Sequence, residues 1–304
     1  YWDYFKSMFS NHEIYYAMWP SQVPYFRYGE MSLLSAVLYW PFKWIIKNDL
    51  WAYYVHISSI YALVGFSMYQ LSSLFVGSRV LAAIGGLLLV TSNYYLASID
   101  QVNVISAYPG ILCFYFILKW YKTKKINLLY IASILYGLQI YASGYLFFYL
   151  NIVLLGLGLF YWNTIFKLKN FKHIISAIFI GILIISPYIY LYIIHSQESL
   201  CFNAGRNIEI VNALSIHWKY FTNSLPYNLI YGDRLDRTLI ENIKSISLGI
   251  ILPIIAFSSI FLFSFTRKKL AIISILFVLV LFGLGPQIHV GNFTFPSPIY
   301  QYIL

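Results

Sequence analysis

The chain has 304 residues, of which 60% are hydrophobic and only 10% are charged, and its formal net charge is +10. Soluble domains carry about 25% charged residues, so the composition excludes an ordinary soluble globular protein and indicates an integral membrane protein. The positive charge does not indicate nucleic acid as a partner, because half of the basic residues fall in three short clusters that suit anionic lipid headgroups.

The N-terminal segment, residues 1–50, is expected to lie outside the membrane and to end in a helix at the membrane interface. Residues 31–47 are apolar, but Pro41 interrupts them, and Lys43 and Lys47 lie beside aromatic residues such as Trp44. This mixture is typical of an amphipathic helix in the interface. The alternative is one more span, which would reverse every later loop against the distribution of charge.

Long apolar runs follow the interfacial segment. A helix of about 20 residues crosses the hydrocarbon core, and lipid cannot satisfy open backbone groups. The runs are 51–75, 80–97, 104–121, 127–142, 145–162, 173–194, 245–265 and 270–284. The sequence therefore predicts an all-α fold, a polytopic transmembrane helical bundle with about eight spans and one outer interfacial helix.

These runs also divide the chain into regions. Residues 51–195 and 245–284 are predicted to hold the transmembrane helices. The polar stretch 196–244 is expected to form an extracytoplasmic subdomain, and 285–304 a further outer segment. Because the chain begins with Tyr1 and its first segment is expected outside, we expect a fragment of a longer protein with an upstream span that starts in the cytoplasm.

Basic and acidic residues occupy alternate gaps between the apolar runs. The three basic clusters are Lys119, Lys122, Lys124 and Lys125; Lys167, Lys169 and Lys172; and Arg267, Lys268 and Lys269. The acids are Asp3, Glu13, Glu30, Asp49, Asp100, Glu198, Glu209, Asp233, Asp236 and Glu241, and all lie in the other gaps. Loops rich in Lys and Arg stay in the cytoplasm. The sequence therefore predicts a multi-pass protein of the cytoplasmic (plasma) membrane with its carboxylates outside.

The outer carboxylates are the candidates for acid/base chemistry. Asp3, Glu13 and Glu30 lie among aromatic residues and Arg27 in the first segment. Partial desolvation there would raise the pKa of a carboxyl group toward the range useful for a general base. The alternative is that these are solvated acids beside an aromatic belt. Asp100, in a short outer turn, either faces the same cavity or caps the next span.

Basic residues of the large outer loop are the candidates for holding phosphate. A guanidinium fork binds phosphate through two hydrogen bonds, so Arg206, with Lys219 nearby, suits a phosphate headgroup. Arg234 and Arg237 more simply pair with the acids beside them. The histidines show no metal-ligand spacing, and no cofactor motif is present, so we expect neither a metal nor a cofactor.

Several short stretches together resemble a known family. They are Asn11-His12-Glu13 through Trp19-Pro20, Tyr28-Gly29-Glu30-Met31, Leu38-Tyr39-Trp40-Pro41-Phe42, Gly65-Phe66-Ser67-Met68-Tyr69, Ala107-Tyr108-Pro109, Gly137-Leu138-Gln139 with Ser143-Gly144-Tyr145, and Gly283-Leu284-Gly285-Pro286 with Pro296-Ser297-Pro298. The chain resembles YfhO-like membrane proteins of the GT-C superfamily of polytopic glycosyltransferases. The resemblance implies transfer of a sugar from a polyprenyl-phosphate donor to an extracytoplasmic glycan, lipid or protein acceptor in the cell envelope.

In that superfamily an acid of the first outer loop acts as base or positions the acceptor. The resemblance implies this role for Asp3, with Glu30 as the second candidate. We expect Glu13, Arg27, Asp100, Arg206 and Lys219 to bind the substrates. The alternative from another class is a non-catalytic carrier, flippase or assembly factor for lipid-linked polymers. A carrier would show inverted repeats or broken spans, of which Pro187 is the only hint.

Overall fold

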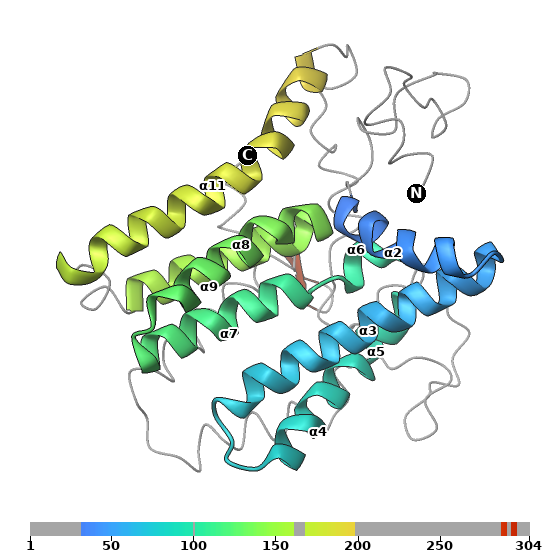
Figure 1. The fold of residues 1–304 in the computed structure, drawn as a ribbon, viewed down its shortest axis with the longest axis horizontal. Coiled ribbons are helices and arrows are strands. Elements are labelled where there is room, and N and C mark those ends of the chain that lie inside the picture. Colours follow the sequence, from blue (N-terminus) through green and yellow to red (C-terminus); the bar gives the residue numbers. More distant parts are fainter. Residues whose placement is uncertain (1–31, 100, 161–167, 198–286, 291–292, 297–304) are drawn as a thin grey trace. The chain divides into compact units, whose positions relative to one another are not determined.

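The computed structural model describes residues 32–99, 101–160, 168–197, 287–290 and 293–296. Most of these residues form helices (Figure 1). The helices are α2 (Leu33–Ile45), α3 (Asp49–Ser73), α4 (Arg79–Val90), α5 (Asn93–Ala97), α6 (Val102–Ile105), α7 (Tyr108–Thr123), α8 (Ile126–Ala142), α9 (Gly144–Phe160) and α11 (Leu168–Gln197). The regular structure within the described residues from 32 to 197 is therefore helical, as the sequence predicts.

Of the six predicted spans in the described part of the chain, four correspond to single helices and two are broken. The runs 51–75, 127–142, 145–162 and 173–194 correspond to α3, α8, α9 and α11. The run 80–97 is divided between α4 and α5, and the run 104–121 is broken between α6 and α7. Residues 196–197 end α11; the rest of the predicted 196–244 subdomain and the two runs after it lie outside the described residues.

A short β-hairpin occurs in the predicted outer segment 285–304. Its strands, β1 (Gln287–Val290) and β2 (Phe293–Pro296), pair antiparallel with Gln287 opposite Pro296 and Val290 opposite Phe293. The prediction contained no strand here. The signal was present, because polar and apolar residues alternate from Gln287 to Val290, which is the period of a strand.

The chain divides into two compact units. The first consists of Tyr1–Val90, Ile99–Leu150 and Asn163–Asn203, and the second of Thr91–Ser98, Asn151–Trp162 and Ala204–Leu304. Within the first unit, α3 packs against α2, α4, α6 and α7, while α8 packs against α2, α7 and α11. These two helices thus form the centre of the first unit.

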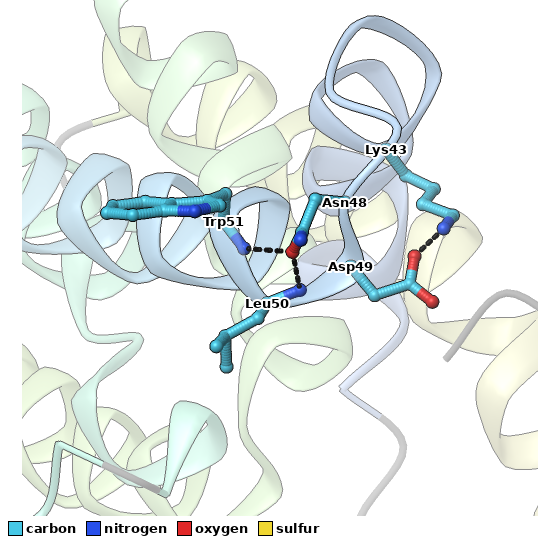
Figure 2. A network of polar contacts seen from close by, with 5 residues as sticks. All are labelled: Lys43, Asn48, Asp49, Leu50 and Trp51. Atoms are coloured by element: carbon cyan, nitrogen blue, oxygen red, sulfur yellow. Dashed lines mark hydrogen bonds and ion pairs between the residues drawn. The ribbon is translucent and has the colours of Figure 1, made fainter.

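Helix α3 begins at a well-formed cap (Figure 2). The Asn48 side-chain oxygen accepts hydrogen bonds from the backbone N–H groups of Leu50 at 3.0 Å and Trp51 at 3.2 Å. Such a cap satisfies donors that the first helical turn leaves free. Beside it, Lys43 of α2 pairs with Asp49. This pair is largely exposed and so contributes little stability, but it ties the end of α2 to the start of α3.

The contacts between helices fix their relative directions. Residues Gly65 and Ser72 of α3 lie against Gly86 and Gly85 of α4, in reverse order, so these two helices are antiparallel. Contacts from α8 to α11 run in the same order on both helices: Tyr130 with His173, Ser133 with Ala177, and Tyr141 with Ile184. Helices α8 and α11 are therefore parallel.

Helix α7 completes the pattern. Its start contacts the end of α8, through Gly110 and Gln139, and its end packs with the start of α8, through Trp120 and Leu129. These two helices are antiparallel. At the end of α7, the Lys122 ammonium donates to the carbonyl of Leu74, just after α3. Helices α3 and α7 therefore end at the same level, as the predicted threading requires.

Glycines allow α3 and α4 to approach closely. A Cβ atom added at Gly86 would lie 2.5 Å from the carbonyl oxygen of Gly65, a backbone atom that has no rotamer by which to move away. The two helices therefore pack backbone to backbone at this crossing, which is a common arrangement in membrane helices.

We expect Gly86→Ala to destabilise the helix pair. Overpacking a close contact costs about 1–3 kcal/mol, so the midpoint of thermal unfolding in detergent should fall. Gly77→Ala is the matched control, because nothing lies within 4 Å of a Cβ atom added at Gly77. Equal unfolding midpoints for the two variants would show that α3 and α4 do not approach as closely as described.

Candidate functional site

The residues predicted to carry out chemistry lie outside the part of the chain that the structure describes. These are Asp3, Glu13, Arg27, Glu30, Asp100, Arg206 and Lys219. Their roles as catalytic and substrate-binding residues remain predictions from the sequence. The described residues instead show what surrounds the start of α7 and how charge is distributed between the two ends of the helices.

A proline breaks the helix that the sequence predicted to be continuous from residue 104. Pro109 has no N–H to bond the carbonyl of Ile105, and its ring would clash with that carbonyl in a continuous helix. Helix α6 accordingly ends at Ile105, whose carbonyl accepts a hydrogen bond from the Ala107 N–H at 2.9 Å. Helix α7 then starts at Tyr108, with the proline in its first turn.

The side chain of Gln139 fills the gap that this break opens. In a continuous helix the Gly110 N–H would bond the carbonyl of Ser106. Instead, the Gln139 amide nitrogen donates to the Ser106 carbonyl at 3.2 Å, and its oxygen accepts from the Gly110 N–H at 2.7 Å. One amide from α8 therefore replaces a single missing backbone hydrogen bond and satisfies both of its partners.

Helix α2 covers the same place. The Ser35 hydroxyl of α2 lies 3.4 Å from the Ser106 hydroxyl, which also donates to the carbonyl of Val102 at 2.6 Å. Ser35, Ser106 and Gln139 are each at most 1% exposed. We call Ser35, Ser106, Gly110 and Gln139 the polar junction. Since its side chains are neutral hydroxyl and amide groups that pair with one another and with the backbone, the junction holds the backbone in place and supplies no acid or base.

A buried histidine of α3, His56, packs against α2. His56 is 2% exposed, and its Nδ1 atom has no hydrogen-bond partner. Its ring packs edge-on against Tyr39, with centroids 5.6 Å apart, and against Phe42 at 6.4 Å. These aromatic surroundings are those of a packing residue. Among the described residues, no group of three or more His, Cys, Asp or Glu side chains is placed to bind a metal ion.

Basic residues from two different gaps gather at one end of the helices. Trp120 of α7, Leu129 of α8 and Ala177 of α11 form one buried cluster, with Ile174 packed against it. The lysines that follow Trp120 and the exposed Lys172 of α11 are therefore brought to the same end. The Lys122 contact with Leu74 adds the turn between α3 and α4, which leads to Arg79.

The described carboxylate lies at the opposite end. Asp49 is the single acid among the residues that the structure describes, and it occupies the first turn of α3. Helix α3 has 25 residues, so it separates Asp49 from Leu74 by about 37 Å. This distance exceeds the thickness of a bilayer's hydrocarbon core. Lys43 and Lys47 lie at the same end as Asp49, and Lys43 pairs with it, so the acid distinguishes this end of α3 from the other without making it net negative.

Two stretches of helix are long and apolar enough to cross a membrane by length and composition, Val102–Thr123 and Phe171–Tyr190. Of the most apolar 18-residue window in the second stretch, 17% is buried against the rest of the chain. Outward-facing apolar residues on α11 include Ile178, Phe179 and Ile182. Exposed apolar surface of this kind is typical of a membrane-facing or protein-binding surface.

Side-chain hydroxyl groups donate hydrogen bonds to the backbone carbonyls of α11 near its proline, Pro187. Pro187 leaves the carbonyl of Leu183 without its usual helical partner. The Ser186 hydroxyl donates to that carbonyl at 2.9 Å, and the Tyr141 hydroxyl donates to the neighbouring carbonyl of Ile184 at 2.7 Å. Side-chain donors of this kind are needed where water cannot reach the backbone.

No protein-family model, curated protein or solved structure matches this chain.

Proposed function

We propose that this chain is a polytopic plasma-membrane protein that transfers a sugar from a polyprenyl-phosphate donor to an acceptor outside the cell membrane. The observation that supports the membrane placement is the pair of stretches long and apolar enough to cross a membrane, Val102–Thr123 and Phe171–Tyr190. The antiparallel and parallel pairs of helices support the threading that puts the lysines in the cytoplasm.

The assignment of sugar transfer rests on the sequence resemblance to YfhO-like proteins of the GT-C superfamily. In this proposal Asp3 is the base and Glu30 is the second candidate. Arg206 and Lys219 hold the donor phosphate. Glu13, Arg27 and Asp100 contact the sugar and the acceptor from the outer surface.

The proposed reaction is an inverting displacement. The acceptor hydroxyl oxygen attacks the anomeric carbon and forms the new glycosidic bond, while the bond from that carbon to the phosphate oxygen breaks. The hydroxyl proton passes to the Asp3 carboxylate, and the polyprenyl phosphate leaves with the electron pair. Arg206 and Lys219 stabilise the charge that develops on this phosphate, which is where we expect the largest contribution to the rate.

The direct test is a transfer assay in membranes. Membranes that contain the chain are supplied with a radiolabelled polyprenyl-phosphate sugar, and label is followed into material that is no longer lipid-linked. Transfer above that of membranes without the chain supports the proposal. Label that stays lipid-linked, across a panel of donor sugars, contradicts it.

One observation favours a second candidate, a carrier for lipid-linked polymers. The break between α6 and α7 lies within one of the two membrane-length stretches, and discontinuous helices are typical of transporters. Reconstituted vesicles separate the candidates, because a carrier moves a fluorescent polyprenyl-phosphate sugar between leaflets without cleaving it, whereas a transferase cleaves it.

A further inference from the structure

Two lysines lie in the turn between α7 and α8, Lys124 at the end of α7 and Lys125 at the start of α8. Other residue types are usually preferred at both of these helix caps. Lys124 caps α7 in the left-handed conformation, with φ of 59°, and it is the non-glycine residue with positive φ in the described part of the chain. Glycine is preferred at such a cap because a side chain there costs about 1–2 kcal/mol. The lysine is therefore present despite a local cost.

Lys125 is also an unfavourable residue for the start of α8. It is the N-cap residue of α8, and its side chain makes no capping hydrogen bond. Serine, threonine, aspartate or asparagine would cap this end. A positive charge also interacts unfavourably with the N-terminal end of a helix dipole. Residues that are unfavourable for the helix ends they occupy are expected to be there for a functional reason.

The lysines of this turn lie against aromatic rings. The Lys124 ammonium is 4.2 Å from the centre of the Tyr121 ring and 5.6 Å from that of Trp120. The Lys122 ammonium is 5.6 Å from the centre of the Phe75 ring. Aromatic rings beside cations are typical of the headgroup level of a membrane. The arrangement places exposed ammonium groups where lipid phosphates lie.

Neighbouring helices extend the positive surface. The cluster of Trp120, Leu129 and Ala177 brings the start of α11, with the exposed Lys172, to the α7–α8 turn. Among the described residues no carboxylate lies at this end to neutralise these cations, since Asp49 is at the far end of α3. The surface is therefore suited to an anionic partner.

We propose that the turn between α7 and α8 is a binding site for the phosphate headgroup of an anionic phospholipid, with Lys124 and Lys125 as its principal ligands. The site rests on the membrane placement in the proposed function but not on sugar transfer. Lys124 and Lys125 bind the phosphate, and Lys172 adds to the attraction. The site would fix the depth at which the cytoplasmic ends of α7, α8 and α11 lie.

The test uses a double variant that corrects both helix ends, Lys124→Gly with Lys125→Ser. A short-chain phosphatidylglycerol is titrated onto the detergent-solubilised chain, and bound lipid is counted by native mass spectrometry. We expect affinity to fall by about tenfold, because each cation near an anionic surface contributes a severalfold attraction. We also expect the midpoint of thermal unfolding to stay the same or rise, since glycine and serine suit these positions.

The control variant removes the same charge from the other end, Lys43→Gln with Lys47→Gln, and should leave affinity for phosphatidylglycerol unchanged. Phosphatidylcholine should bind all three chains weakly and equally. An equal fall in affinity for the two double variants, or no fall for the first, overturns the proposal. Full competition by inorganic phosphate would also overturn it, because the site would then serve a free anion. These outcomes are independent of whether any sugar is transferred.

Discussion

Gln139→Leu should destabilise the chain by about 2–6 kcal/mol, the largest stability effect that the structure predicts. The variant leaves the Ser106 carbonyl and the Gly110 N–H without the partners that hold them at 3.2 Å and 2.7 Å. Each buried polar group left unsatisfied costs about 1–3 kcal/mol. The two groups cannot pair with each other without closing the break, which Pro109 opposes. Thermal unfolding in detergent and the yield of folded protein measure the effect.

The matched control is Gln70→Leu on α3, where the side chain is partly exposed. It makes the same chemical change outside the polar junction and should shift stability by less than about 0.5 kcal/mol. A second substitution, Pro109→Ala in the Gln139→Leu background, tests the mechanism, because it restores a backbone N–H at position 109 and allows a continuous helix. Partial recovery is expected. Equal stability of Gln139→Leu and the unaltered chain would show that the amide does not bridge the break.

Asp3→Asn should lower the rate of sugar transfer by at least about a hundredfold while leaving the amount of folded protein in the membrane unchanged. Loss of a general base typically costs this much or more, because the acceptor hydroxyl must then lose its proton unaided. The measurement is the initial rate of transfer at equal protein content, with the donor held at saturation.

Two further variants locate the effect. Asp49→Asn removes an acid that the sequence predicts to lie on the same side as Asp3, but Asp49 is exposed and paired with Lys43, so transfer should continue. Glu30→Gln tests the second candidate. Unchanged turnover in Asp3→Asn with loss in Glu30→Gln would move the base to Glu30. Normal turnover in both would remove the proposed role of the first outer segment.

The sequence was sufficient to predict most helices but not the points where they break. Apolar runs gave the positions of α3, α8, α9 and α11 within a few residues, because helix length and hydropathy are local properties. The cap at Asn48 and the α6–α7 break had local signals too. Pro109 in particular is a local signal for a break, although the run from 104 to 121 was predicted as one helix.

Other features depend on contacts between distant parts of the chain. The amide of Gln139 and the N–H of Gly110 are 29 residues apart, and no local pattern assigns a buried glutamine on an apolar helix to that partner. The same holds for the contact of Lys122 with Leu74, 48 residues away. The catalytic assignments for Asp3 and Glu30 come from resemblance, so they depend on experiment rather than on packing.

The proposed function depends above all on which end of the helices faces the cytoplasm. In a background of Cys201→Ser, the variants Thr123→Cys and Lys47→Cys are expressed in intact cells and treated with a membrane-impermeant maleimide. Lys47→Cys should be modified at once, whereas Thr123→Cys should react only after the membrane is opened. The reverse pattern would contradict the orientation, and modification of both positions in intact cells would contradict the placement of α3 and α7 across the membrane.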